Sequence, residues 1–165
     1  MKTIPLTQGK VAIVDDRDYD WLNQFKWRAY KDYKMFYAMR SCSKGPPTIE
    51  AMHRKVLGLI YRDGKQVDHI DGDGLNNQRN NLRICNHAQN QQNQRIQVGG
   101  TSRYKGVSWG KRNKRWIVEI RKNGATSYVG SFKDEVKAAK AYDKRAKELY
   151  GEFARLNFPK EVKRP

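Results

Sequence analysis

The last 65 residues carry the clearest alternation of hydrophobic and polar positions in the chain. From 134 to 150, apolar residues recur every three or four positions, which predicts an amphipathic helix that Gly151 ends. Before it, a turn such as Asn123-Gly124 separates runs of β-forming residues. These predicted strands are 106–109, 115–121 and 127–132. The pattern therefore predicts a three-stranded antiparallel sheet packed on one helix.

The first 60 residues give a less regular pattern. An acidic segment from about 16 to 25, carrying Trp21 and Leu22, predicts a short helix, and 49–59 predicts another. Short β-like runs flank the first helix at 10–14, 26–30 and 35–40. We expect a small sheet with helices here, so the whole chain belongs to the α+β class.

A polar segment separates these two parts. Residues 89–94 are all Gln or Asn, and residues 98–102 contain two glycines and two hydroxyl side chains, which suit a flexible connector. We therefore predict one domain at 1–98, a linker at 99–102, a second domain at 103–159 and a frayed tail at 160–165.

The charge of the chain indicates a polyanionic partner. It has 34 Lys and Arg against 17 Asp and Glu, a net charge of +17, which is more than solubility requires. Residues 101–165 hold 18 of the basic and 7 of the acidic side chains. No apolar stretch approaches the roughly 18 residues of a membrane span, so we expect nucleic acid and not a membrane.

The cysteines and the N-terminus indicate a reducing compartment. Cys42 and Cys85 are the two cysteines, they form no C-x-x-C pair, and the first residues lack the apolar core of a signal peptide. We expect a cytoplasmic protein without structural zinc, because close pairs of Cys or His ligands are missing.

Residues 67–83 carry the candidate chemistry. Asp68 and His69 stand side by side ahead of a loop rich in Gly and Asn. Hydrolysis of a phosphodiester needs a base that generates hydroxide and a cation that neutralises the developing charge, which an imidazole and a carboxylate-bound metal can supply. The alternative is a turn with a satisfied histidine. Asp71 and Asp73 fit turn formation, and an EF-hand would need Glu near 79 or 80.

The spacing of these residues resembles the HNH nuclease motif. Asp68-His69 is followed by Asn81 twelve residues after the histidine and by Asn90 nine residues further on. The resemblance, centred on residues 53–95, implies a ββα-metal fold in which two strands and a helix hold one divalent ion. It implies that His69 is the general base, Asp68 and Asn90 are metal ligands, and Asn81 orients the imidazole.

This ligand set suggests the metal. A carboxylate and an amide oxygen are hard donors that suit Mg²⁺, with Mn²⁺ as a substitute, better than Zn²⁺. His87, three residues before Asn90, is the alternative ligand if the helix starts later. The earlier pair His53-Arg54 is expected to be structural or to contact phosphate.

Residues 103–159 resemble an AP2 domain, through segments such as Tyr104-Lys105-Gly106-Val107, Ala141-Tyr142-Asp143 and Leu156-Asn157-Phe158-Pro159. In that family the sheet lies in the major groove of double-stranded DNA. Ser108 and Gly110 stand where plant AP2 domains have base-reading arginines, so a different specificity is expected. The predicted DNA contacts are Lys105, Trp109, Arg112, Lys114, Arg115, Arg121 and Tyr128.

Together these features predict a metal-dependent DNA endonuclease. The architecture resembles the free-standing homing-type endonucleases of bacteriophages, which act in the cytoplasm of the host cell. One active site per chain predicts nicking by a monomer or weak dimer. The main alternative is a DNA-binding regulator whose nuclease motif is inactive. RNA is a weaker alternative substrate, because a sheet fits poorly in the deep, narrow groove of an A-form helix.

Overall fold

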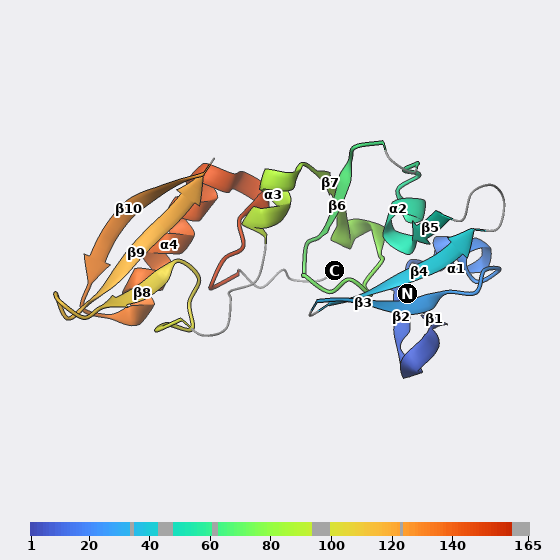
Figure 1. The fold of residues 1–165 in the computed structure, drawn as a ribbon, viewed down its shortest axis with the longest axis horizontal. Coiled ribbons are helices and arrows are strands. Elements are labelled where there is room, and N and C mark those ends of the chain that lie inside the picture. Colours follow the sequence, from blue (N-terminus) through green and yellow to red (C-terminus); the bar gives the residue numbers. More distant parts are fainter. Residues whose placement is uncertain (34, 43–47, 61–62, 94–99, 123, 160–165) are drawn as a thin grey trace. The chain divides into compact units, whose positions relative to one another are not determined.

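The structure is a computed structural model that describes residues 1–33, 35–42, 48–60, 63–93, 100–122 and 124–159. It has mixed α and β structure in small sheets, and its residues group into two compact units, Met1–His87 and Ala88–Pro165 (Figure 1). This division puts residues 88–92 in the second unit, whereas the sequence places them in the first domain. The proposed ranges 1–98 and 103–159 stay predictions.

The first unit opens with a hairpin and a short helix. Antiparallel pairing sets Ile4 opposite Ala12, and the alternation of side chains buries Ile4, Ala12 and Val14. The pattern does not predict the first strand, because Ile4 is its one buried residue and Pro5 follows. The elements are β1 (Lys2–Pro5), η1 (Thr7–Gly9), β2 (Val11–Val14) and α1 (Asp16–Leu22).

A three-stranded antiparallel sheet follows, in the order β3-β4-β5. The predicted helix at 49–59 is wrong in its first turn: Ala51 has extended backbone angles and pairs with Met39, so the helix begins at Met52. Pairing with a neighbouring strand overrides the local preference of this segment. The elements are β3 (Arg28–Asp32), β4 (Met35–Cys42), β5 (Thr48–Ala51) and α2 (Met52–Val56).

The candidate catalytic segment forms a second hairpin. Asp68 pairs with Arg83 and His69 with Leu82, and a long loop between the strands closes with a 3₁₀ turn. The elements are β6 (Gln66–His69), η2 (Arg79–Asn81), β7 (Leu82–Cys85) and α3 (His87–Gln92).

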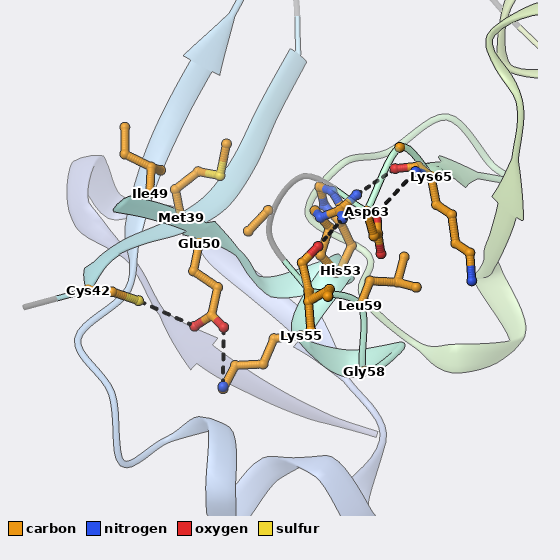
Figure 2. A pocket seen from close by; sticks show the side chains of 14 residues that line it. Met39, Cys42, Ile49, Glu50, His53, Lys55, Gly58, Leu59, Asp63 and Lys65 are labelled. Atoms are coloured by element: carbon orange, nitrogen blue, oxygen red, sulfur yellow. Dashed lines mark hydrogen bonds and ion pairs between the residues drawn. The ribbon is translucent and has the colours of Figure 1, made fainter. Parts of the chain in front are cut away.

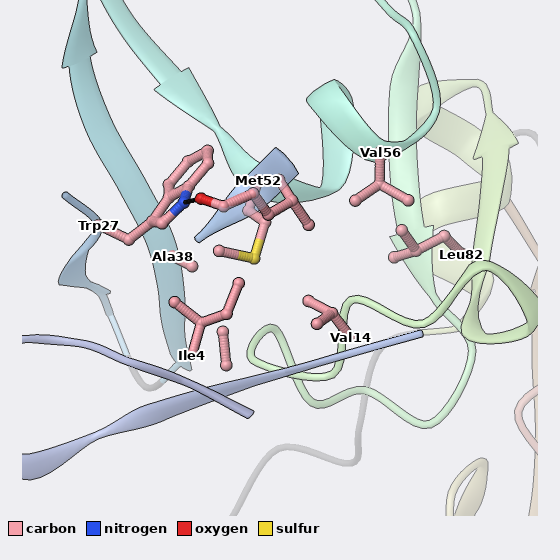
Figure 3. Close-up of a cluster of buried hydrophobic side chains, with 9 residues drawn as sticks. Ile4, Val14, Trp27, Ala38, Met52, Val56 and Leu82 are labelled. Atoms are coloured by element: carbon pink, nitrogen blue, oxygen red, sulfur yellow. Dashed lines mark hydrogen bonds between the residues drawn. The ribbon is translucent and has the colours of Figure 1, made fainter. Parts of the chain in front are cut away.

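The core of the first unit joins these elements. Met52 and Val56 from α2, Val14 from β2 and Leu82 from β7 are almost completely buried together (Figure 3). Each such side chain contributes about 1.5–3 kcal/mol by leaving water. The indole Nε1 of Trp27 donates to the carbonyl of Leu22 at 2.9 Å, so the buried ring keeps its hydrogen bond. This core packs α2 and the β6–β7 hairpin against the same sheet.

The second unit contains the strands and the helix predicted for its sequence. The sheet order is β10-β9-β8, and α4 packs against the sheet. Asp134 caps the helix by accepting from the backbone N–H of Lys137 at 2.7 Å. Neither α4 nor any other helix in the described part of the chain is long and apolar enough to cross a membrane. The elements are β8 (Val107–Gly110), β9 (Arg115–Lys122), β10 (Ala125–Phe132), α4 (Glu135–Tyr150) and η3 (Gly151–Phe153).

Gly106 shows how closely the second unit is packed. It has a φ of +73°, and a Cβ added there would lie 2.0 Å from Cδ2 of Tyr142. Both the backbone angle and the space therefore require glycine at the start of β8.

Candidate active site and nucleic-acid interface

Asp68 lies near the end of β6 and is only 5% exposed. It forms an ion pair with Arg83. Its Oδ2 accepts from Nε of Arg83 at 2.9 Å and from the guanidinium Nη2 at 2.6 Å. The two residues are direct cross-strand partners. A divalent ion bound by Asp68 would therefore share this carboxylate with Arg83.

His69, 4% exposed, lies against two other rings. Its centroid is 5.1 Å from that of His53 in α2 and 5.9 Å from that of Tyr37 in β4. Burial lowers the pKa of His69 below its ordinary 6.5, although Asp71 and Asn77 act in the opposite direction. The imidazole is therefore neutral at pH 7, which is the form that can accept a proton.

His53 is a second neutral imidazole at this site. Burial, together with the neighbouring His69 and Arg54, lowers the pKa of His53 to about 3. Within the described part of the chain its Nδ1 is buried and has no hydrogen-bond partner. The predicted phosphate contact of His53 stays a prediction.

Asn81 organises the loop that follows His69. Its Oδ1 accepts from the backbone N–H of Asp71 at 3.0 Å, and its Nδ2 donates to Asp71 Oδ1 at 3.0 Å and to the carbonyl of Asn76 at 2.8 Å. Its own carbonyl accepts from Ile70. These bonds act on the backbone next to His69, so any effect of Asn81 on the imidazole passes through the loop.

The same loop is fastened to the N-terminal hairpin. The backbone of Ile13 bonds to Leu75 at 2.9 Å and to Asn77 at 2.7 Å. Nearby, the guanidinium of Arg79 donates twice to the carboxylate of Asp18 at 2.8 Å. This pairing lowers the pKa of Asp18 below its ordinary 3.8. The first 20 residues therefore help to shape the candidate active site.

Arg54 has a structural role in α2. It donates to the carbonyls of Lys65 and Ile60 and to Oδ1 of Asp63, each at 2.6 Å. These contacts border a cavity of about 800 Å³ beside His53 (Figure 2). The guanidinium of Arg54 therefore binds the segment that precedes β6. The phosphate contact predicted for Arg54 stays a prediction.

The helix α3 begins at His87, which is exposed, and Nδ1 of His87 lies 3.4 Å from Nε2 of Gln66. Asn90 lies half-buried inside α3. Its role as a metal ligand, and the alternative role of His87, stay predictions. Among the described residues no group of three or more His, Cys, Asp or Glu is arranged to hold a metal ion.

The seven predicted DNA contacts do not all lie on one face of the sheet in the second unit. Trp109 pairs with Trp116 and shares the face of buried Val107 and Val118, which is the face toward α4. Neighbouring positions point to opposite faces of a sheet. The opposite face therefore carries Arg115, Arg121 and Tyr128. Arg112 and Lys114 are exposed in the turn between β8 and β9.

Lys105 is partly withdrawn from solvent. Its ammonium donates to the carbonyl of Gln92 at 2.6 Å, at the end of α3. Burial, with the charge of Arg155 nearby, lowers the pKa of Lys105 to about 8. Of the predicted DNA contacts, Lys105 thus has a clear intramolecular role.

Comparison with known proteins identifies the first part of the chain. A family model described as HNH endonuclease matches residues 52–92, which include Asp68, His69 and Asn81. An uncharacterized HNH endonuclease of Acanthamoeba polyphaga mimivirus is 31% identical over 156 residues, covering 91% of this chain and 76% of that protein. The chain belongs to the HNH endonuclease family.

Two further relatives of this endonuclease cover different shares of it. Protein 3.8 of Escherichia phage T7 is 31% identical over 126 residues, 76% of this chain and 98% of that protein. Dehydration-responsive element-binding protein 2C of Arabidopsis thaliana is 43% identical over 70 residues, 39% of this chain but only 19% of the plant protein. The endonuclease is therefore similar to a mimivirus HNH endonuclease and a phage protein over most of its length, and to a plant element-binding protein over a smaller, AP2-like part.

Several residues of the candidate active site could not be predicted from the sequence pattern. No sequence motif marks Tyr37, which lies in an ordinary strand pattern. None marks Asn77 either, which is fully buried inside a polar loop. Arg83 could have been found, since a hairpin register aligned on His69 and Leu82 sets it opposite Asp68. The anchoring pair Asp18 and Arg79 is 61 residues apart and has no local signature.

Proposed function

We propose that the chain is a metal-dependent endonuclease that hydrolyses a phosphodiester of double-stranded DNA with His69 as the general base. The observation that carries this proposal is the buried imidazole of His69, next to Asp68 in β6, inside the segment that matches the HNH endonuclease family. A neutral imidazole held by the fold is ready to take a proton from water.

The residues would share the reaction as follows. His69 accepts a proton from a water molecule, and the resulting hydroxide attacks phosphorus while the P–O bond to the leaving sugar oxygen breaks. Asn81 holds the loop after His69 by its bonds to Asp71 and Asn76. Its contribution is to keep the base and the hairpin in a fixed geometry.

The donor chemistry of the proposed ligands fits a hard divalent cation. Asp68 offers a buried carboxylate, and Asn90 offers an amide oxygen from α3, a set that suits Mg²⁺ or Mn²⁺. When bound, the ion would neutralise charge on the phosphate and assist the leaving oxygen. Arg83 pairs with Asp68 and would hold this carboxylate in place before the ion binds.

The second unit would anchor the DNA. Its outer sheet face carries Arg115, Arg121 and an exposed Tyr128, and the chain has a net charge of +17. The partial homology to a plant element-binding protein supports binding by this unit in the manner of an AP2 domain. Phosphate contacts would position the protein, and contacts to base edges would select the site.

A plasmid assay tests the catalytic proposal. Supercoiled DNA with Mg²⁺ should become open-circular, whereas EDTA or the variant His69→Ala should lower the rate by about 10²–10⁴-fold, the usual contribution of a general base. His87→Ala distinguishes the two proposed ligands, because it should lower the rate only if His87 replaces Asn90 as ligand. DNA binding without cleavage in Mg²⁺ and Mn²⁺ would instead favour an inactive regulator.

The biological setting follows from the same proposal. One active site per chain supports nicking by a monomer or weak dimer. The mimivirus and phage relatives support a mobile, homing-type nuclease that acts in the cytoplasm of an infected cell. Mapping the cut strand on an end-labelled duplex would test this, since two cuts at one site would contradict the nicking proposal.

A further inference from the structure

Two rings from two other elements lie against the ring of the candidate base. This ring cluster consists of Tyr37 from β4, His53 from α2 and His69 from β6. The planes of His53 and His69 meet at 87°, with centroids 5.1 Å apart, and Tyr37 lies 5.8 Å from His53 and 5.9 Å from His69. These distances are typical of favourable ring contacts, and His53 meets both other rings edge to face, whereas Tyr37 and His69 are tilted at 55°.

Tyr37 is held from the side of the catalytic loop. A Cβ added to Gly74 would lie 2.7 Å from Cδ1 and from Cε1 of Tyr37, so the loop backbone rests directly on this ring. The strand also pairs Tyr37 with Tyr30. The ring of Tyr37 is therefore held in place, and the imidazole of His69 packs against it.

His53 is held from the side of α2. The residues Met52 and Val56 are at most 2% exposed and fasten this helix to the core, while Arg54 bonds to the segment before β6. Within the described residues Nδ1 of His53 makes no hydrogen bond, and the ring is uncharged at neutral pH. His53 therefore acts on His69 through the shape of its ring.

We propose that His53 and Tyr37 are positioning residues that fix the plane of the His69 imidazole so that it can accept a proton from water. This inference rests on the proposed role of His69 as general base. It assigns to the histidine of α2 a function in orienting the base and no direct part in the chemistry. Because the effect depends on ring shape, phenylalanine should replace His53 with little loss.

The first experiment measures kcat and KM for nicking of a duplex oligonucleotide by His53→Ala, His53→Phe and Tyr37→Leu. His53→Ala and Tyr37→Leu should lower kcat by about 10- to 100-fold with KM unchanged, as expected for a misplaced catalytic group. His53→Phe should retain most of the rate. Equal losses in His53→Phe and His53→Ala would overturn the proposal.

Val56→Ala is the matched control for a merely structural effect. Val56 lies on the same helix and is 2% exposed, but it belongs to the hydrophobic core and not to the ring cluster. This variant should melt at a lower temperature, while kcat per folded molecule stays unchanged. A loss of kcat in Val56→Ala as large as in His53→Ala would mean that general destabilisation explains both.

A second readout is independent of catalysis. Long-range ¹H–¹⁵N spectra of the histidine rings should show shifted or broadened His69 signals in His53→Ala and nearly native ones in His53→Phe. Unchanged His69 signals in His53→Ala would refute the positioning role, even if cleavage is slower. By contrast, cleavage that survives in His69→Ala would refute the proposed function, whatever the spectra of the His53 variants show.

Discussion

At the scale of single residues, the candidate active site contains two buried groups of opposite charge that form an ion pair. Asp68 and Arg83 have side chains only 6% and 11% exposed, and they face each other across the β6–β7 hairpin. A buried pair of this kind adds little net stability compared with apolar residues, but its separation is costly. Its role here is to hold the Asp68 carboxylate in place within the candidate active site.

Removal of Arg83 should therefore destabilise the first unit strongly. Arg83→Met leaves the carboxylate of Asp68 buried without its guanidinium partner, so we expect the free energy of unfolding to fall by about 3–5 kcal/mol, measured by urea denaturation. The double variant Asp68→Asn with Arg83→Met should recover part of this loss. A change below about 1 kcal/mol, as for a surface pair, would contradict the description of the pair as buried.

At the scale of elements, the loop between β6 and β7 is tied to the N-terminal hairpin and to α1. The bonds between Ile13 and the loop backbone join segments more than 60 residues apart, and Asp18 in α1 receives the guanidinium of Arg79. Long-range contacts therefore help to shape this loop.

The tie between Asp18 and Arg79 should give a defined pH dependence. The pKa of Asp18 is lowered, chiefly by the hydrogen bond from Arg79, so the folded state binds a proton less readily than the unfolded state. The stabilisation is fully present above the ordinary pKa of 3.8 and is lost as pH falls through the lower folded value.

Asp18→Asn, in which the carboxylate is absent, is the comparison that isolates this tie. Urea unfolding should show the wild-type advantage at pH 6 and a shrinking advantage below pH 4, the range set by the ordinary pKa of 3.8. A difference that stays constant across this range would show that Asp18 does not titrate as described.

At the scale of the whole molecule, a net charge of +17 makes binding to DNA strongly dependent on salt. The outer face of the sheet in the second unit concentrates Arg115, Arg121 and Tyr128, whereas lysines such as Lys140 lie exposed on α4. If net charge governs DNA binding, removal of any one charge should have the same effect on affinity. If the sheet face governs it, only removal of a charge on that face should have a large effect.

Arg121→Met should therefore weaken DNA binding and lower the slope of log K against log salt by about 1, the effect of losing one phosphate contact. Lys140→Met removes the same charge from the helix and should leave the slope nearly unchanged. Affinity measured by fluorescence anisotropy from about 50 to 200 mM salt gives both slopes. Equal slopes for the two variants would indicate that net charge, and not the sheet face, governs binding.

The sequence by itself determined what depends on local pattern. Periodicity of two and of 3.6 residues gave the strands and helix of the second unit, and the spacing of Asp68, His69 and Asn81 marked the segment that matches the HNH endonuclease family. The same spacing suggested the role of Asn90, which stays a prediction. Such features need only neighbouring residues or a motif, so a single chain reveals them.

The tertiary structure decided what depends on distant neighbours. Strand pairing converted the start of the predicted 49–59 helix into β5, and the register separated Trp109 from Arg115 and Arg121. Folding also brought Tyr37 and His53 against His69, although they lie 32 and 16 residues before it in the chain. No local signature encodes these contacts, because they arise from how separately formed elements pack around one core.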